Sequence, residues 1–113
     1  MRDIISGTVV RGKKKGGKLG FPTVNILPDK KIGSGVYEGK VIVNSKKYKA
    51  GIFVGPDDKL LEAHIVGFGG NLYGKEIEVE VGTKIREVMN FNSDEDLKKQ
   101  IKEDIEKICS RGL

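Results

Sequence analysis

Polar and apolar residues alternate along much of the first 81 residues. In Glu76–Val81, three aliphatic side chains fall on one face and three glutamates on the other, which is the two-residue period of a half-buried strand. Asn44-Ser45 separates two β-rich runs and predicts a hairpin with a two-residue link. The β-rich runs that we expect to form strands besides Glu76–Val81 are Ile4–Arg11, Val36–Val43, Lys46–Val54 and Leu60–Val66.

The hydrophobic period changes near the C-terminal end. Ser93-Asp94-Glu95-Asp96 is typical of a helix N-cap followed by acids in the first turn. Leucine and isoleucine then recur at helical spacing, and Arg111-Gly112 indicates the end of the helix. The apolar positions are Leu97, Ile101, Ile105 and Ile108. We therefore expect one amphipathic helix of about four turns against the sheet.

Many short antiparallel strands followed by one late helix favour a closed β-barrel with a helical flank. The sequence contains no internal repeat and no linker, so we expect residues 1–113 to form a single domain. Two stretches, Gly12–Lys31 and Gly82–Phe91, fit neither period. Loops of that length in so small a domain are usually functional.

The distribution of charge favours an anionic ligand. Residues 1–50 contain twelve Lys/Arg against three Asp/Glu, whereas residues 51–113 contain nine against thirteen, within a net charge of +5. A basic half is typical of proteins that bind nucleotide phosphates, nucleic acid or a membrane surface. The single cysteine excludes an intrachain disulfide, and no apolar run is long enough to span a membrane. We expect a cytoplasmic protein.

The segment Gly12–Gly20 is rich in glycine and lysine and is similar to a phosphate-binding loop. Gly12, Gly17 and Lys18 have P-loop spacing, but Leu19 occupies the position that needs Ser or Thr for magnesium. Phe21-Pro22 follows where a P-loop opens into a helix, so the P-loop interpretation is rejected. An anion could still be held by exposed backbone N–H groups and lysines; a solvated basic hairpin tip is the alternative.

Thr23 and Asn25 are separated by one residue, so in an extended chain their side-chain oxygens point the same way. A hydroxyl and an amide oxygen suit a magnesium ion that bridges phosphates. Turn hydrogen bonding is the alternative role for such a pair.

The motifs of the chain, taken in order, are similar to those of the riboflavin kinase family. The matching pieces are Gly7-x-Val9-Val10-Arg11-Gly12, Lys18-Leu19-Gly20-Phe21-Pro22-Thr23-Val24-Asn25, Gly35-Val36-Tyr37, Glu62-Ala63-His64-Ile65, Leu72-Tyr73-Gly74-Lys75, Ile85-Arg86 and Phe91. This resemblance implies a six-stranded antiparallel Greek-key barrel with one C-terminal helix. It also implies Mg²⁺, ATP as phosphate donor, and riboflavin as acceptor, with FMN as product.

The resemblance also implies roles for individual residues. Glu62 is the expected catalytic base, and Thr23 and Asn25 are the expected metal and phosphate contacts, so all three must lie close together. The expected nucleotide-binding residues are Arg11, Gly12, Lys18, Gly20, Pro22, Thr23, Tyr73 and Gly74. The expected flavin-binding residues are Arg86, Glu87 and Phe91.

The chain departs from the family pattern at two positions. Val88 stands where the family usually has a Glu, with Glu87 one place earlier, and Asn71 stands where an Asp commonly precedes Leu-Tyr-Gly. The chain also lacks the adenylyltransferase domain often fused upstream in bacterial relatives, so we expect it to stop at FMN. We expect a monomer whose partners are small molecules, without membrane or nucleic acid.

Two other functions remain open at this point. A small basic barrel could bind single-stranded nucleic acid, although the seven aromatic residues form no basic-aromatic alternation. A non-catalytic flavin- or nucleotide-binding module is the third possibility, and a turnover assay separates it from a kinase. The sequence does not distinguish ATP from CTP or GTP as the donor.

Overall fold

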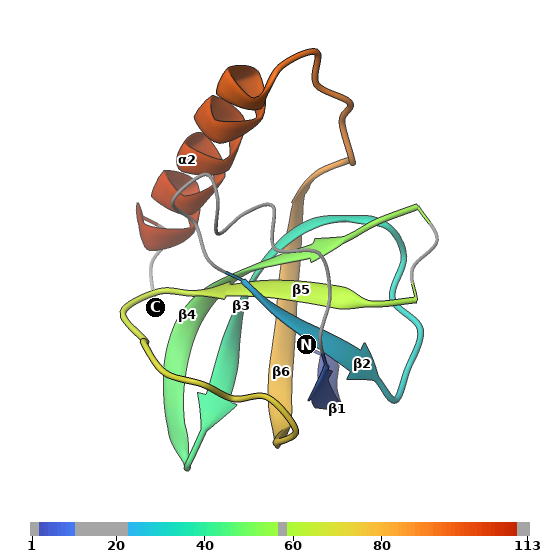
Figure 1. Ribbon diagram of the computed structural model, residues 1–113, viewed down its shortest axis with the longest axis vertical. Helices are drawn as coiled ribbons and strands as arrows, with labels where there is room; N and C mark the ends of the chain where they lie inside the picture. The colour runs from blue at the N-terminus through green and yellow to red at the C-terminus, as the bar shows by residue number, and fades with distance from the viewer. Residues whose placement is uncertain (1–2, 11–22, 57–58, 111–113) are drawn as a thin grey trace.

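Six antiparallel strands close into a barrel in the order β1-β2-β5-β4-β3-β6, and one helix packs outside it (Figure 1). The computed structural model describes residues 3–10, 23–56 and 59–110. The elements are β1 (Asp3–Val10), β2 (Val24–Pro28), β3 (Gly35–Val43), β4 (Lys46–Val54), β5 (Leu61–Ile65), β6 (Glu76–Arg86) and α2 (Asp94–Ser110). The predicted fold class, a six-stranded antiparallel barrel with a C-terminal helix, is confirmed.

The core lies inside the barrel and is almost entirely aliphatic. Along β5, for example, Leu61, Ala63 and Ile65 are buried while Glu62 and His64 face outward, as strand alternation requires. Every strand contributes side chains to this cluster. The buried members are Ile5, Val9, Ile26, Val41, Val43, Ala50, Ile52, Val54, Leu61, Ala63, Ile65, Leu72, Ile77, Val79 and Val81.

The predicted hairpin between β3 and β4 is confirmed. Asn44 and Ser45 both have positive φ, at 50° and 68°, which is the backbone of a type I′ turn. Pairing then runs without interruption from Val43 opposite Lys46 to Gly35 opposite Val54. This hairpin supplies two of the six strands of the barrel.

Two predictions of strand boundaries were wrong. The stretch Gly12–Lys31 contains a strand, β2, which pairs with both β1 and β5. Strand β6 does not end at Val81 but continues to Arg86, through irregular pairing with β3. Short length hid the first strand, and broken alternation hid the extension of the second.

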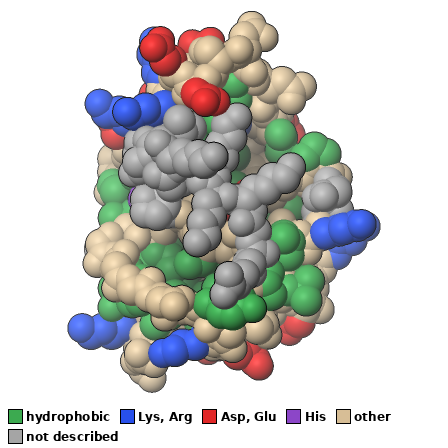
Figure 2. Space-filling model, viewed as in Figure 1, with side chains coloured by type: hydrophobic (Ala, Val, Ile, Leu, Met, Phe, Trp, Pro, Cys, Tyr) green, Lys and Arg blue, Asp and Glu red, His purple; other side chains and the backbone are tan. Residues whose placement is uncertain are grey.

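Helix α2 begins at the predicted cap, because the Asp96 N–H donates to the Ser93 hydroxyl at 3.1 Å. Its apolar face covers the outside of β4 at Gly51, where an added Cβ would lie 3.0 Å from Ile108 Cδ1 and 3.2 Å from Ile105 Cδ1. A glycine at this point therefore allows the helix to pack close to the strand. Figure 2 shows acidic side chains gathered where α2 begins, and the first turn carries Asp94, Glu95 and Asp96. The predicted stop at Arg111-Gly112 lies outside the described residues.

Among residues 3–10, 23–56 and 59–110, no helix is both long and apolar enough to cross a membrane.

Gly39 allows β3 to pack closely against β6. A Cβ at this position would collide with the backbone oxygen of Glu80 and with the side chain of Ile52. We expect Gly39→Ala to lower the free energy of unfolding by about 1–3 kcal/mol, because backbone must move to admit the methyl group. Gly69→Ala is the control, since nothing lies within 4 Å of a Cβ there. Urea denaturation followed by circular dichroism measures both, and equal midpoints would contradict the packing described.

Candidate active site

A row of cross-strand neighbours runs over the outer face of the barrel. Asn25 on β2 lies opposite Glu62 on β5, and Glu62 lies opposite Phe53 on β4. Phe53 lies opposite Val36 on β3, which in turn lies opposite Arg86 on β6. Glu62 and Phe53 point outward because the residues that flank them in their strands, such as Leu61, belong to the core. The barrel therefore places five residues from five strands side by side.

Arg86 enters this row because of irregular pairing in β6. The regular register, in which Gly39 lies opposite Val81, would bring Lys84 to Val36, but two register shifts bring Arg86 there instead. The two extra residues form β-bulges, which bend a strand and redirect its side chains. The carboxylate of Glu38 accepts a hydrogen bond from the Thr83 N–H at 2.8 Å. That bond satisfies a backbone group at the bulge, and Glu38 is only 7% exposed.

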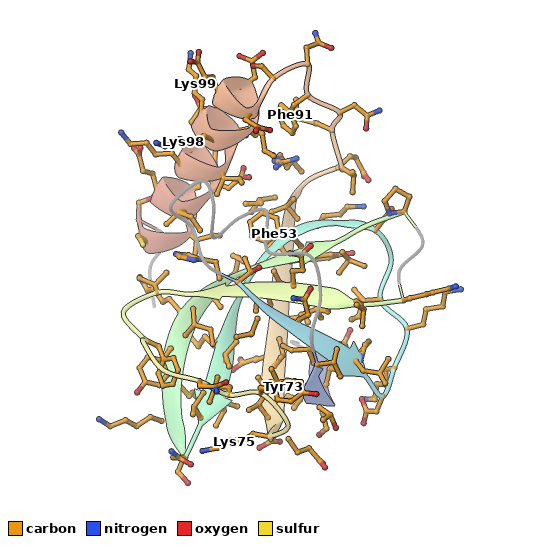
Figure 3. All side chains as sticks on the ribbon, in the orientation of Figure 1. Phe53, Tyr73, Lys75, Phe91, Lys98 and Lys99 are labelled. Atoms are coloured by element: carbon orange, nitrogen blue, oxygen red, sulfur yellow. The ribbon has the colours of Figure 1, made fainter. Side chains whose placement is uncertain are left out.

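Four members of the row, all but Asn25, line a pocket of about 420 Å³, a size typical of small-molecule sites. Val36 and Phe53 supply an apolar floor, and Glu62 and Arg86 also line the pocket. The segment Val88–Asp94 and Leu97 of α2 form the opposite wall. Figure 3 shows Phe53 on the barrel below the loop that carries Phe91. The pocket can therefore enclose a flat apolar group between the barrel and the loop.

At one end of the pocket, Glu62 lies beside Thr23 and Asn25, the two residues expected from the sequence to be its neighbours. The Thr23 hydroxyl donates a hydrogen bond to Glu62 Oε1 at 3.1 Å. Asn25, 7% exposed, is the direct cross-strand neighbour of Glu62. The proximity that the predicted roles require is present, and the roles themselves stay predictions. Three oxygen-bearing side chains thus lie together where Glu62 reaches the pocket.

At the other end, Arg86 is held by α2. Its Nε and Nη2 donate to the two carboxylate oxygens of Asp104 at 2.9 Å and 2.7 Å, and its Nη1 donates to the Glu87 backbone oxygen at 3.0 Å. Phe91 lines the pocket, whereas Glu87 is not among its lining residues. The Glu87 side chain is exposed and pairs with Lys84 at 2.8 Å, a hydrogen bond that raises the pKa of Lys84. Of the three predicted flavin contacts, the structure brings Arg86 and Phe91 to the pocket.

Tyr73 and Gly74 lie away from this pocket. Figure 3 shows Tyr73 at the opposite end of the molecule from Phe91. The Gly74 N–H donates to the Val9 backbone oxygen at 2.9 Å, which attaches this loop to the C-terminal end of β1. The Asn71 side-chain oxygen accepts a hydrogen bond from the Tyr73 N–H at 2.9 Å. An aspartate would make the same bond, so the departure from the family pattern at this position preserves the local turn.

The other predicted nucleotide-binding residues, Arg11, Gly12, Lys18, Gly20 and Pro22, lie outside the described residues, and their roles stay predictions.

The sequence analysis missed three residues of the site. Val36 has the composition of a core position, and Phe53 alternates with core residues in its strand, but only the structure shows that both face the pocket under the loop. Asp104 belongs to a helix rich in charged residues, so its burial to 1% exposure could not be distinguished from an ordinary wet face. A possible signal was its position within the apolar stripe, between Ile101 and Ile108.

Comparison with known proteins identifies the family. The model of the family described as "Flavokinase: Riboflavin kinase" matches residues 3–110. The chain belongs to the riboflavin kinase family. Among curated relatives it is 41% identical to the RNA-binding riboflavin kinase RibR of Bacillus subtilis, over 96% of this chain and 50% of that protein. It is 42% identical to a bifunctional riboflavin kinase/FMN adenylyltransferase of Buchnera aphidicola, over 90% of this chain and 36% of that protein.

Solved structures show the same architecture. A riboflavin kinase from Trypanosoma brucei aligns over 93% of this chain and 76% of its own, with a TM-score of 0.67 and 27% identity. A Streptococcus pneumoniae structure named as a macrolide-efflux protein aligns with a TM-score of 0.87 and 29% identity, over 96% of this chain and 39% of its own. The chain thus spans half or less of the curated relatives described above, and what those whole proteins do is not transferred by the match alone.

The position of Arg86 in this riboflavin kinase family member depends on the bulge that Glu38 supports. We expect Glu38→Ala to lower the free energy of unfolding by about 1–2 kcal/mol, because the Thr83 N–H loses its partly buried acceptor. Glu38→Gln retains a side-chain oxygen at the same distance from the backbone and should lose at most half as much. Thermal unfolding of the two variants provides the comparison. Wild-type stability of Glu38→Ala would show that the carboxylate does not support the bulge.

Proposed function

We propose that this protein is a riboflavin kinase, which transfers the terminal phosphate of ATP to the 5′-hydroxyl of the ribityl chain of riboflavin. The products are FMN and ADP. The observation that supports this most strongly is that Thr23 and Asn25 lie beside Glu62, which lines the pocket. Family membership supports the reaction class, and the geometry supports the proposed roles.

Glu62 is the proposed general base. Its carboxylate lies at the pocket edge, where it can accept the proton of the ribityl hydroxyl as the oxygen attacks the terminal phosphorus. A bond forms between that oxygen and phosphorus, and the bond from phosphorus to the bridging oxygen of ADP breaks. The hydrogen bond from Thr23 limits the orientations that the carboxylate can adopt. The side chain is therefore held ready before the substrate arrives.

The oxygens of Thr23 and Asn25 fit a magnesium ion that arrives with the nucleotide. Within the described residues no group of three or more His, Cys, Asp or Glu could hold a metal ion. Magnesium bound to nucleotides usually takes only one or two protein ligands and keeps phosphate oxygens and waters. Two neutral oxygens beside one carboxylate fit that arrangement. Such an ion would neutralise charge on the phosphate oxygens during transfer.

The flavin ring is proposed to lie over Phe53 and Val36. This floor is apolar, and Phe91 and Val88 face it from the loop. An aromatic floor favours a flat ring by offset stacking. Arg86 at the far end offers N–H donors to the polar edge of the ring, while Glu62 at the near end faces the ribityl chain. Because the two ends of the pocket offer different groups, the flavin is proposed to bind in one orientation only.

The direct test is turnover. Purified protein with Mg²⁺, ATP and riboflavin should yield FMN and ADP in equal amounts, and chelation of the metal with EDTA should abolish the reaction. CTP and GTP in place of ATP identify the donor. Binding of riboflavin without any FMN formation, with every triphosphate, would instead indicate a non-catalytic flavin-binding module.

Loss of the base should separate catalysis from binding. We expect Glu62→Gln to lower kcat by roughly 10²–10⁴-fold, because an amide cannot accept the proton. Nucleotide affinity should change little. Glu78→Gln, which alters an exposed carboxylate on the outer face of β6, is the matched control. Normal turnover by Glu62→Gln would remove this residue from the mechanism.

The floor of the pocket should determine the affinity for flavin. We expect Phe53→Leu to raise the KM for riboflavin by roughly 2–10-fold, because stacking is lost while the floor stays apolar. Glu87→Gln should leave this KM within about twofold, since its exposed pairing with Lys84 contributes little. Steady-state kinetics at saturating ATP measure both values. A larger effect at Glu87 than at Phe53 would place the flavin outside the pocket.

Binding of RNA is a second candidate function, favoured by one observation. The RNA-binding riboflavin kinase RibR is 41% identical over 96% of this chain, although this chain spans only 50% of that protein. The net charge of +5 is compatible with a polyanion. Filter binding of single-stranded RNA at increasing salt tests it, and a steep loss of affinity with salt is the expected signature. Absence of binding at low salt would exclude this function.

A further inference from the structure

Asp104 is a buried acid on the helix, and the proposed reaction does not use it directly. It is 1% exposed, and the residues that surround its place in α2 include Ile105 and Ile108, which pack on β4. Burying a carboxylate is costly unless the charge is paired and hydrogen-bonded. Its contacts therefore indicate what the helix gains from an acid at this position.

Four hydrogen bonds converge on the Asp104 carboxylate, and one of them is a second bond from the Arg86 Nε, to Oδ2 at 3.1 Å. The Nε of Arg86 donates to Oδ1 at 2.9 Å and the Nη2 donates to Oδ2 at 2.7 Å. The Gln100 Nε2, one turn earlier on the same helix, donates to Oδ1 at 3.0 Å. A two-point contact between a guanidinium and a carboxylate fixes the plane of the guanidinium as well as its position.

The fixed guanidinium of Arg86 contacts both the pocket and the loop above it. Arg86 lines the pocket, and its Nη1 donates to the backbone oxygen of Glu87, the first residue of the loop that forms the opposite wall. The Arg86 side chain is 16% exposed, so its orientation is set mainly by protein contacts. One carboxylate on α2 thereby orients the cation at one end of the pocket and holds the start of the loop.

We propose that Asp104 is a positioning residue for the flavin acceptor, acting through Arg86. This inference rests on the proposed function, because it concerns the substrate of that same pocket. A purely structural ion pair would stabilise α2 without favouring one substrate over the other. A positioning residue, in contrast, affects the flavin and leaves the nucleotide largely unaffected, since Thr23, the predicted nucleotide contact that lies beside the pocket, is at the Glu62 end.

The test compares Asp104→Asn with the wild type in steady-state kinetics. In this variant an amide N–H group faces the guanidinium donors, so Arg86 loses one of its two fixed contacts. We expect the KM for riboflavin to rise about tenfold or more, while the KM for ATP stays within about twofold. Quenching of riboflavin fluorescence on binding gives the affinity without turnover and should weaken by a similar factor.

The control is Glu106→Gln, which removes a carboxylate from an exposed position of the same helix and should leave both KM values unchanged. Gln100→Met is a milder second variant that keeps the ion pair and removes only the hydrogen bond to Asp104. It should raise the KM for riboflavin about two- to fourfold, and it decides the question if Asp104→Asn does not fold.

Two results would overturn the inference: an unchanged riboflavin KM in folded Asp104→Asn, or equal increases in the KM values of riboflavin and ATP. If Asp104→Asn is unfolded, an unchanged riboflavin KM in Gln100→Met overturns it. Failure of the proposed function is a different outcome, because there the wild-type protein itself forms no FMN.

Discussion

The backbone register between neighbouring strands determines which side chains can meet on the outside of this barrel. Antiparallel pairing brings Asn25, Glu62, Phe53 and Val36 into one transverse row. Each of them is next in sequence to a residue that faces the interior of the barrel. A shift of one residue in any strand would turn its member of the row inward. The closed barrel prevents such shifts, because every strand is paired on both sides. The proposed chemistry therefore depends on a rigid surface rather than on loops alone.

Helix α2 completes the site by covering part of that surface. It approaches β4 closely because Gly51 has no side chain, and it presents Asp104 to Arg86 at the end of β6. The ion pair has a structural cost, since two charges are withdrawn from water. Its retention is accounted for if the guanidinium has to face a polar substrate group in a fixed orientation. In the proposed function, packing of the helix and recognition of the flavin are linked through Arg86.

Much of this arrangement could be predicted from the sequence at the positions where a residue pattern is compatible with only one local structure. The hairpin at Asn44-Ser45 and the helix after Ser93 are examples, because the first needs positive φ and the second follows from capping and a helical period. The proximity of Thr23 to Glu62 was expected from motif resemblance and is present as a hydrogen bond. Barrel closure followed from the number of short alternating strands.

The remainder depended on tertiary pairing that sequence patterns do not contain. Strand β2 is only five residues long and ends in a proline, so its local signal is weak. The bulges in β6 interrupt alternation after Val81 and concealed the strand that carries Arg86. Phe53 has the composition of a core residue, yet the register places it in the pocket floor. The burial of Asp104 arises only when the helix docks.

The most direct measurement is a crystal structure of the protein with Mg²⁺, ADP and riboflavin. The account predicts that the flavin ring lies between Phe53 and the loop at Phe91, with Arg86 at its polar edge. The ribityl 5′-oxygen should then lie within hydrogen-bonding reach of Glu62, about 2.6–3.2 Å. A flavin bound elsewhere, or a 5′-oxygen directed away from Glu62, would contradict the central claim that the transverse row forms the phosphoryl-transfer site.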